Sequence, residues 1–266
     1  MPARESFVDI HCHLLPGIDD GASDWNESLA MARLAVADGI RTVIVTPHQL
    51  GAYRENDGRK IRARTAQLQQ FLEQRGVPLQ VLPGADVRIE PEMIGRIRGG
   101  EVLTLADQGR FVLLELPHEV FLPLDPLLKD LDRAGLVGIL SHPERNVGIL
   151  GQPEVVGPLV DRGCLLQVTA GSLTGTFGLH VQRLAERLIV EGLVHFLATD
   201  AHSSKSRRPL LRRSFDRVVE LTDYRTACAL CCENPARVVA DEAVIPGRRR
   251  PKRSGLTRWL GWCKAG

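Results

Sequence analysis

The sequence lacks the features that hold a chain in a membrane or direct it to secretion. It contains no stretch of 18 consecutive apolar residues, so no transmembrane helix is expected. Residues 1–6 lead directly into a strand-like apolar run, without the longer apolar region and small-residue cleavage site of a secretory leader. We therefore expect a cytoplasmic protein.

A strong net charge and a regular set of cysteines are also missing. The 34 basic and 32 acidic residues give a net charge of +2, which offers no reason to expect a nucleic-acid partner. The six cysteines form no disulfide framework, and we expect reduced thiols. Cys228, Cys231 and Cys232 suggest zinc, but a fourth nearby ligand is missing, so packing is the preferred interpretation.

Seven short apolar or β-branched runs recur along the chain, mostly separated by longer amphipathic segments. The predicted strands are Phe7–Ile10, Thr42–Val45, Gln80–Leu82, Phe111–Leu114, Val137–Leu140, Leu165–Val168 and His195–Ala198. The predicted helices are Ser28–Val36, Ile61–Arg75, Leu124–Ala134, Gln152–Arg162, Val181–Glu191, Leu210–Leu221 and Tyr224–Cys232. An Asp24-x-x-Glu27 capping pattern precedes the first helix, and Gly39 ends it.

This alternation predicts an α/β fold with a mainly parallel sheet. An open doubly wound sheet would give the same alternation, whereas seven units favour a TIM-like barrel, and the placement of polar residues must decide. We expect one domain over residues 1–245. The segment 246–266 is basic and carries Trp259 and Trp262; contact with an anionic membrane surface is one interpretation, and a disordered tail is the preferred one.

The triplet His11-Cys12-His13 follows the first strand. Residues two apart on an extended chain project to the same face, so the two imidazoles point together while Cys12 points away. Imidazole suits Zn, Mn or Fe, and parallel α/β folds build their sites just past the strand ends. This pair alone is weak support for a metal site.

Potential metal ligands stand at the ends of most of the other predicted strands as well. They are His48, Asp86, Glu115, His142, Asp200 and His202. In a barrel these ends converge on one rim, which would make residues from 11 to 202 neighbours. Asp20, in an Asp-Asp-Gly turn, is an open candidate, whereas His118, His180 and His195 are interpreted as structural.

So many ligands exceed the needs of one ion and predict a cluster of two or three. Mixed imidazole and carboxylate donors without thiolate select Mn²⁺, Zn²⁺ or Fe²⁺. Such clusters suit hydrolysis by metal-activated water, and phosphoester cleavage fits best. It also requires fixed positive charge, for which Arg145 is the first candidate and Arg88, Arg207 and Arg208 are further ones.

At this point the motifs resemble a known group. HCHLLPGIDDG, TPHQLGAY, GADVRIEPE, LLELP, SHPERN, QVTAGSLTGTFG and ATDAHS, in this order over residues 7–204, are similar to the polymerase-and-histidinol-phosphatase (PHP) superfamily. More narrowly, they resemble its bacterial manganese-dependent tyrosine-protein phosphatases of capsule and exopolysaccharide synthesis.

The resemblance implies a distorted seven-stranded (βα) barrel that holds Mn²⁺ ions and cleaves phosphotyrosine. It places at the metal-ligand positions His11, His13, Asp20, His48, Asp86, Glu115, His142, Asp200 and His202. It assigns phosphate binding to Arg145 and to one of Arg207 and Arg208, with Arg208 preferred. The implied partner is the tyrosine-rich phosphotyrosine tail of a membrane-bound tyrosine autokinase.

Asp86 and a cysteine motif leave alternatives to this interpretation. The family usually carries Glu where this chain has Asp86, which leaves the bridging of two ions and the activity undecided. A small-molecule phosphatase, such as one acting on histidinol phosphate, and a weakly active metal-binding module of an export complex are the alternatives. Cys231-x5-Arg237 matches the nucleophilic loop of cysteine-based tyrosine phosphatases, but its helical context and Pro235 do not suit such a loop.

Overall fold

The computed structural model describes residues 5–244, and the predicted tail at 246–266 lies outside them. The strands are β1 Phe7–Cys12, β2 Ile40–Val45, β3 His48–Gln49, β4 Gln80–Pro83, β5 Asp86–Arg88, β6 Phe111–Glu115, β7 Val137–Ser141, β8 Leu165–Thr169 and β9 Phe196–Ala198. All seven predicted runs form strands. β3 and β5 are short extensions of β2 and β4 beyond bends at Pro47 and Gly84.

The strands form two parallel sheets, with the orders β1-β2-β4 and β3-β5-β6-β7-β8-β9. The bends divide two long strands between these sheets: β2 pairs with β4 while β3 pairs with β5. A parallel bridge between Cys12 and Ala201 joins the end of β1 to the segment after β9. The predicted parallel α/β architecture is therefore confirmed, with its ladder divided into two sheets.

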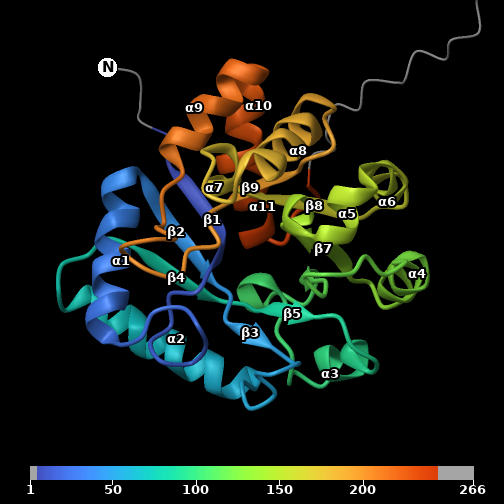
Figure 1. The fold of residues 1–266 in the computed structure, drawn as a ribbon. Coiled ribbons are helices and arrows are strands. Elements are labelled where there is room, and N and C mark those ends of the chain that lie inside the picture. Colours follow the sequence, from blue (N-terminus) through green and yellow to red (C-terminus); the bar gives the residue numbers. More distant parts are fainter. Residues whose placement is uncertain (1–4, 245–266) are drawn as a thin grey trace, which may run out of the picture.

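Helices cover the outside of the sheets (Figure 1). The longer ones are α1 Trp25–Asp38, α2 Gly58–Glu73, α4 Asp125–Arg133, α8 Leu179–Val190 and α9 Arg212–Leu221. The shorter ones are α3 Met93–Arg98, α5 Val147–Gly151, α6 Val156–Asp161, α7 Ala170–Leu173, α10 Tyr224–Cys228 and α11 Asn234–Val239. Figure 1 shows α1 and α2 on one side of the molecule and α4, α5 and α6 on the other.

Local sequence explains both ends of α1. The Asp24 side chain accepts hydrogen bonds from the backbone of Asn26 and Glu27 at the start of α1, and Gly39 ends it in the left-handed region at φ 110°. The Glu27 carboxylate does not complete the predicted capping box. It accepts instead from the backbone N–H of Ser204 at 2.6 Å, and so ties α1 to the loop after β9.

Two predicted helices are interrupted. Gln152–Arg162 begins with a 3-10 turn at Pro153–Val155, where Pro153 takes the first position, and continues as α6. Tyr224–Cys232 runs as α10 into a π-helical turn at Ala229–Glu233. Within residues 5–244, no helix is both long enough and apolar enough to cross a bilayer.

The core has an inner and an outer part. Alternate residues of the strands, such as Ile10, Leu113, Ile139 and Phe196, cluster between the sheets with Val238 of α11. Their neighbours in sequence, for example Val112, Leu114, Leu140 and Leu166, pack outward beneath the helices. The carboxyl ends of the strands remain the place where polar side chains gather.

Candidate metal centre

The carboxyl ends of the strands bring all nine predicted ligands together. Four sets of ligand atoms each lie within 4.8 Å of one another: His13, Asp20, His48 and His202; His11, His142 and Asp200; His11, His13 and Asp86; and His48, Asp86 and Glu115. The shared members join the sets into one continuous cluster. Ligands as far apart in the sequence as His11 and His202 meet here because parallel strands end at the same edge.

His11 and His13 point together from the end of β1, as their spacing predicts. Their Nε2 atoms are 3.2 Å apart, and His11 Nδ1 lies 2.9 Å from Gln167 Oε1. Burial lowers the pKa of His11 to about 3, so its ring is neutral, which is the form that binds metal. Gln167 fixes the orientation of that ring from β8.

His13 is held from behind by Asp19. Its Nδ1 lies 2.7 Å from Asp19 Oδ2, and the same oxygen accepts a hydrogen bond from the backbone of His48. Burial opposes protonation of His13, but the Asp19 carboxylate outweighs it and raises the pKa to about 10. Asp20 instead faces outward, with Oδ1 3.4 Å from His48 Nε2 and 3.5 Å from His202 Nε2.

Asp86 lies at the centre of the cluster and provides a test of whether these residues fit a cation. Both of its carboxylate oxygens are buried without a hydrogen-bond partner among residues 5–244, as is His48 Nδ1. Burial and then the nearby Glu115 raise the pKa of Asp86 to about 8. A buried carboxylate without donors is costly, and divalent ions would neutralise it, so the residues present fit a metal cluster.

Two of the predicted ligands have backbone conformations that L-residues rarely adopt. His142 has φ 34° and Asp200 has φ 49°. His142 directly follows β7 and Asp200 lies two residues after β9, and both side chains lie in the cluster. Such strain persists where the surrounding structure enforces it, and it is common at functional sites.

Two of the candidate arginines, Arg145 and Arg207, lie at the edge of the cluster. Arg145 contacts Asp200 Oδ2, and Arg207 Nη2 lies 2.5 Å from the same oxygen. Arg208 makes no such contact; it lines a cavity of about 110 Å³ that also includes Arg207 and Phe177. The structure thus places Arg207 rather than Arg208 beside the candidate ligand.

Phe177 lies close to both of the arginines that contact Asp200. The Arg145 guanidinium carbon is 4.3 Å from the Phe177 ring centroid, and that of Arg207 is 5.9 Å away. Guanidinium groups are attracted to aromatic faces, so the ring restrains both side chains. Arg88, the remaining candidate, lies beside another predicted ligand, with Nη1 4.0 Å from Glu115 Oε2.

Several residues that support the site were not predicted. Asp9 accepts hydrogen bonds from Thr199 across β1 and β9. The buried Glu144 accepts from the backbone of Thr169 and from the Ser172 hydroxyl, which joins the HPER turn to the segment after β8. Each is a polar residue beside a predicted ligand motif, but the sequence gives no signal that separates it from surface polar residues.

The remaining histidines and Cys231 take no part in the candidate cluster. His118 and His180 are exposed, and His195 lies at the amino end of β9. Cys231 is fully buried in the π-helical turn, and burial raises its thiol pKa well above the ordinary value. A buried thiol of this kind is a poor nucleophile. Arg237, the second residue of the Cys231-x5-Arg237 motif, pairs with Glu242.

Comparison with known proteins gives a consistent picture. The family profile for capsular polysaccharide synthesis, CpsB/CapC, matches residues 7–240. The tyrosine-protein phosphatase YwqE of Bacillus subtilis is 40% identical over 202 residues, which are 76% of this chain and 79% of that protein. The putative tyrosine-protein phosphatase CapC of Staphylococcus aureus is 32% identical over 79% of this chain and 82% of its own length.

A solved structure is also similar. It comes from work on YwqE of Bacillus subtilis and CpsB of Streptococcus pneumoniae, described as metal-dependent tyrosine phosphatases. The TM-score is 0.86 at 34% sequence identity, and the match covers 90% of this chain and 96% of that one. The similarity therefore includes the whole arrangement of strands that carries the cluster.

Proposed function

The chain belongs to the CpsB/CapC family of capsular polysaccharide synthesis, and from that premise we propose that it is a metal-dependent protein-tyrosine phosphatase. The observation that carries the proposal is the cluster of nine imidazole and carboxylate side chains with two arginines at its edge. Its substrate would be the phosphotyrosine tail of a membrane-bound tyrosine autokinase that regulates capsule or exopolysaccharide synthesis.

Three groups of residues would each hold one ion. They are the group around His13 and Asp20, the group around His11 and Asp200, and the group around His48 and Glu115. The mixed imidazole and carboxylate donors, without thiolate, suit Mn²⁺, Zn²⁺ or Fe²⁺. Mn²⁺ is the proposed metal because the sequence motifs resemble those of manganese-dependent phosphatases. Divalent ions bound here supply Lewis acidity, which makes water more acidic and neutralises charge on a phosphoryl group.

Asp86 lies between these groups although its side chain is shorter than that of the Glu usual in the family. Its Oδ2 lies 3.6 Å from His11 Nε2 and 3.4 Å from His48 Nδ1, so one carboxylate reaches ligands of two groups. We propose that Asp86 would help to hold the ions of both groups. This supports an active enzyme over a weakly active binding module.

The chain's own residues would bind the phosphoryl group and hold its charge. Arg145 and Arg207 present guanidinium groups at the edge of the cluster, and charge-assisted hydrogen bonds to phosphoryl oxygens are stronger than neutral ones. Arg208, in the adjoining cavity, is kept as a further phosphate-binding candidate. Asp19 and Gln167 hold the rings of His13 and His11 in place.

The finer points of fold and setting are proposals as well. The bridge between Cys12 and Ala201 supports a distorted seven-stranded barrel, in which β2 with β3 and β4 with β5 each count as one bent strand. We propose one phosphatase domain over residues 1–245 and a cytoplasmic location beside the kinase.

Substrate comparison tests the proposal. The protein with Mn²⁺ would be given a phosphotyrosine peptide, a phosphoserine peptide, p-nitrophenyl phosphate and histidinol phosphate. We expect the phosphotyrosine peptide to have the highest kcat/KM. Preference for histidinol phosphate would favour the small-molecule alternative, and no turnover of any substrate would favour the binding module.

A further inference from the structure

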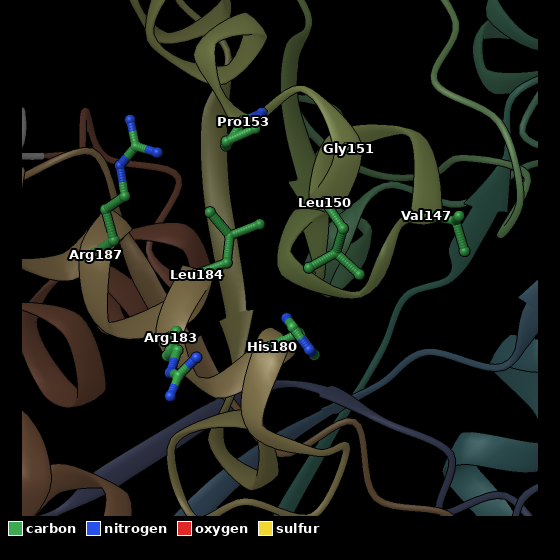
Figure 2. Close-up of a pocket in the computed structure, with 8 residues that line it drawn as sticks. All are labelled: Val147, Leu150, Gly151, Pro153, His180, Arg183, Leu184 and Arg187. Atoms are coloured by element: carbon green, nitrogen blue, oxygen red, sulfur yellow. The ribbon is translucent and has the colours of Figure 1, made fainter.

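A groove next to the candidate centre takes no part in the metal cluster. It lies between α5 with the following turn and α8, and it encloses a cavity of about 550 Å³. Its apolar lining is Val147, Leu150, Pro153 and Leu184, and its polar lining includes His180, Arg183 and Arg187. Figure 2 shows Leu150 and Leu184 in the middle of the groove, with the two arginines of α8 on one side.

Both walls of the groove continue directly from residues at the edge of the cluster. Arg145 precedes Val147 by two residues, and Phe177, which contacts the Arg145 guanidinium, precedes His180 by three. The Asn146 side chain accepts from the backbone of Ile149 and so fixes the start of α5 beside Arg145. A residue of extended peptide spans about 3.3 Å, so a chain bound at Arg145 reaches the groove within a few residues.

Exposed apolar side chains gather along this same edge. Val147 is 46% exposed, and its backbone N–H donates to the carbonyl of His118, two residues before Val120, which is 51% exposed. Leu179 is 52% exposed and precedes His180 of the groove wall. Large apolar side chains exposed beside a concave surface are typical of sites that bind another polypeptide.

The charge of the groove selects the kind of polypeptide. Arg183 is exposed and has no ion pair within residues 5–244, whereas Arg187 pairs with Glu191 at 2.9 Å and Glu154 at 3.8 Å. An uncompensated cation above an apolar floor complements an acidic side chain that is next to an apolar one. The chain's own C-terminal segment is unsuited as occupant, because residues 247–253 are strongly basic.

We propose that this groove binds the part of a protein substrate that flanks the phosphotyrosine, with an acidic side chain opposite Arg183 and an apolar side chain over Leu150 and Leu184. The inference rests on the proposed function and adds a substrate class to it. Sequences with acidic and apolar residues near the phosphotyrosine are preferred over phosphotyrosine alone.

The test compares two phosphotyrosine peptides that differ only in whether the flanking residues are glutamate or glutamine, together with p-nitrophenyl phosphate. The enzymes are the wild type, Arg183→Glu, Arg183→Lys and a control, Arg64→Glu. Arg64 is a partly exposed residue of α2, which Figure 1 places on the other side of the molecule. Each kcat/KM is measured at low salt, where surface charges are least screened.

The wild type is expected to prefer the glutamate peptide. Arg183→Glu lowers kcat/KM for that peptide by roughly fivefold to tenfold and leaves p-nitrophenyl phosphate unchanged, whereas Arg183→Lys and Arg64→Glu keep the preference. Equal loss for both peptides, or no loss, overturns the groove assignment alone. A wild type that cleaves p-nitrophenyl phosphate but neither peptide overturns the proposed function and the groove together.

Discussion

The two ends of the parallel strands carry opposite kinds of polar groups. At the carboxyl end, Asp86 and His48 have buried atoms without hydrogen-bond partners among the described residues. At the amino end, His195 Nδ1 accepts from the backbone of Leu166 at 3.2 Å, and its carbonyl accepts from Asn234 at 3.0 Å. The carboxyl end therefore holds a buried carboxylate without hydrogen-bond donors, whereas the polar atoms of His195 at the amino end have hydrogen-bond partners.

This difference teaches how the fold divides function from stability. Inner-core residues such as Phe111, Phe196 and Val238 fill the space near the amino ends, where α11 packs against the strands. Substitutions there are expected to change the free energy of unfolding first. Substitutions at the carboxyl end are expected to change metal binding and rate first, and some should stabilise the metal-free protein.

Asp86→Asn should have the largest effect. It should lower the catalytic rate and at the same time stabilise the metal-free protein. Loss of the Asp86 carboxylate should lower the rate on p-nitrophenyl phosphate by more than about a hundredfold, since even outer-sphere changes cost tenfold to a hundredfold. The raised pKa of Asp86, about 8, means that the folded carboxyl holds its proton more tightly than the unfolded chain does. Stability therefore falls as pH rises from about 4 to about 8, and the variant should escape this loss.

Thermal melts in chelator at pH 7.5 check the stability half of this prediction. We expect Asp86→Asn to melt above the wild type, and added Mn²⁺ to raise the wild-type Tm more than that of the variant. Asp132→Asn, on the exposed face of α4, is the matched control and should change neither property. A variant that melts below the wild type in chelator would contradict the claim that the buried Asp86 carboxylate destabilises the metal-free protein.

Gln167→Leu probes how the carboxyl end is ordered, with a smaller expected effect. Removing the group 2.9 Å from His11 Nδ1 frees that ring, so the Mn²⁺ concentration for half-maximal rate should rise tenfold to a hundredfold. Saturating Mn²⁺ should restore most of kcat. An unchanged Mn²⁺ dependence would show that Gln167 does not orient the ring.

His195→Asn tests the amino end. Burial lowers the pKa of His195 to about 4, so the unfolded chain takes up a proton more readily than the folded one. Stability is therefore lost as pH falls from about 6.5 towards 4, by roughly 2 kcal/mol between pH 6.5 and 4.5. The Asn side chain can still accept from Leu166 but does not titrate. Urea unfolding in chelator should show a shallower pH dependence for the variant, with unchanged activity near neutral pH.

Phe177→Leu should have the smallest effect. It removes the aromatic face next to Arg145 and Arg207 but keeps an apolar side chain. Cation–π contacts at partly exposed sites contribute about 0.5–1 kcal/mol, so the inhibition constant for inorganic phosphate should rise about twofold to fivefold. A change in stability without any change in phosphate inhibition would assign the ring to packing alone.

Much of the site could be predicted because it depends on strand ends. Once the seven apolar runs are identified as parallel strands, His11, His48, Asp86, His142 and Asp200 must meet at one edge. Residue spacing also predicts that His11 and His13 share a direction. The strands and the main helices follow from the same hydrophobic periodicity.

The rest depends on contacts that a single sequence does not encode locally. Arg207 and Arg208 are adjacent, and the choice between them depends on the loop after β9, where the backbone of His202 donates to the Arg207 carbonyl at 2.9 Å. Gln167 lies inside a strand, so its position relative to His11 follows only from the packing of β8. Asp19 and Asp20 are adjacent in one turn, so the sequence does not decide that Asp19 contacts His13 Nδ1 while Asp20 lies beside His48 and His202.

The central claim is that the nine clustered side chains hold the ions on which catalysis depends. The direct measurement is the p-nitrophenyl phosphate rate of metal-stripped protein as Mn²⁺ is returned, with metal content measured in parallel and with His11→Ala and Cys231→Ser beside the wild type. The account predicts no rate without metal, recovery as two to three ions bind per chain, no recovery in His11→Ala and full activity in Cys231→Ser. A stripped protein and a His11→Ala variant that keep the wild-type rate, with a Cys231→Ser variant that loses it, would contradict the account.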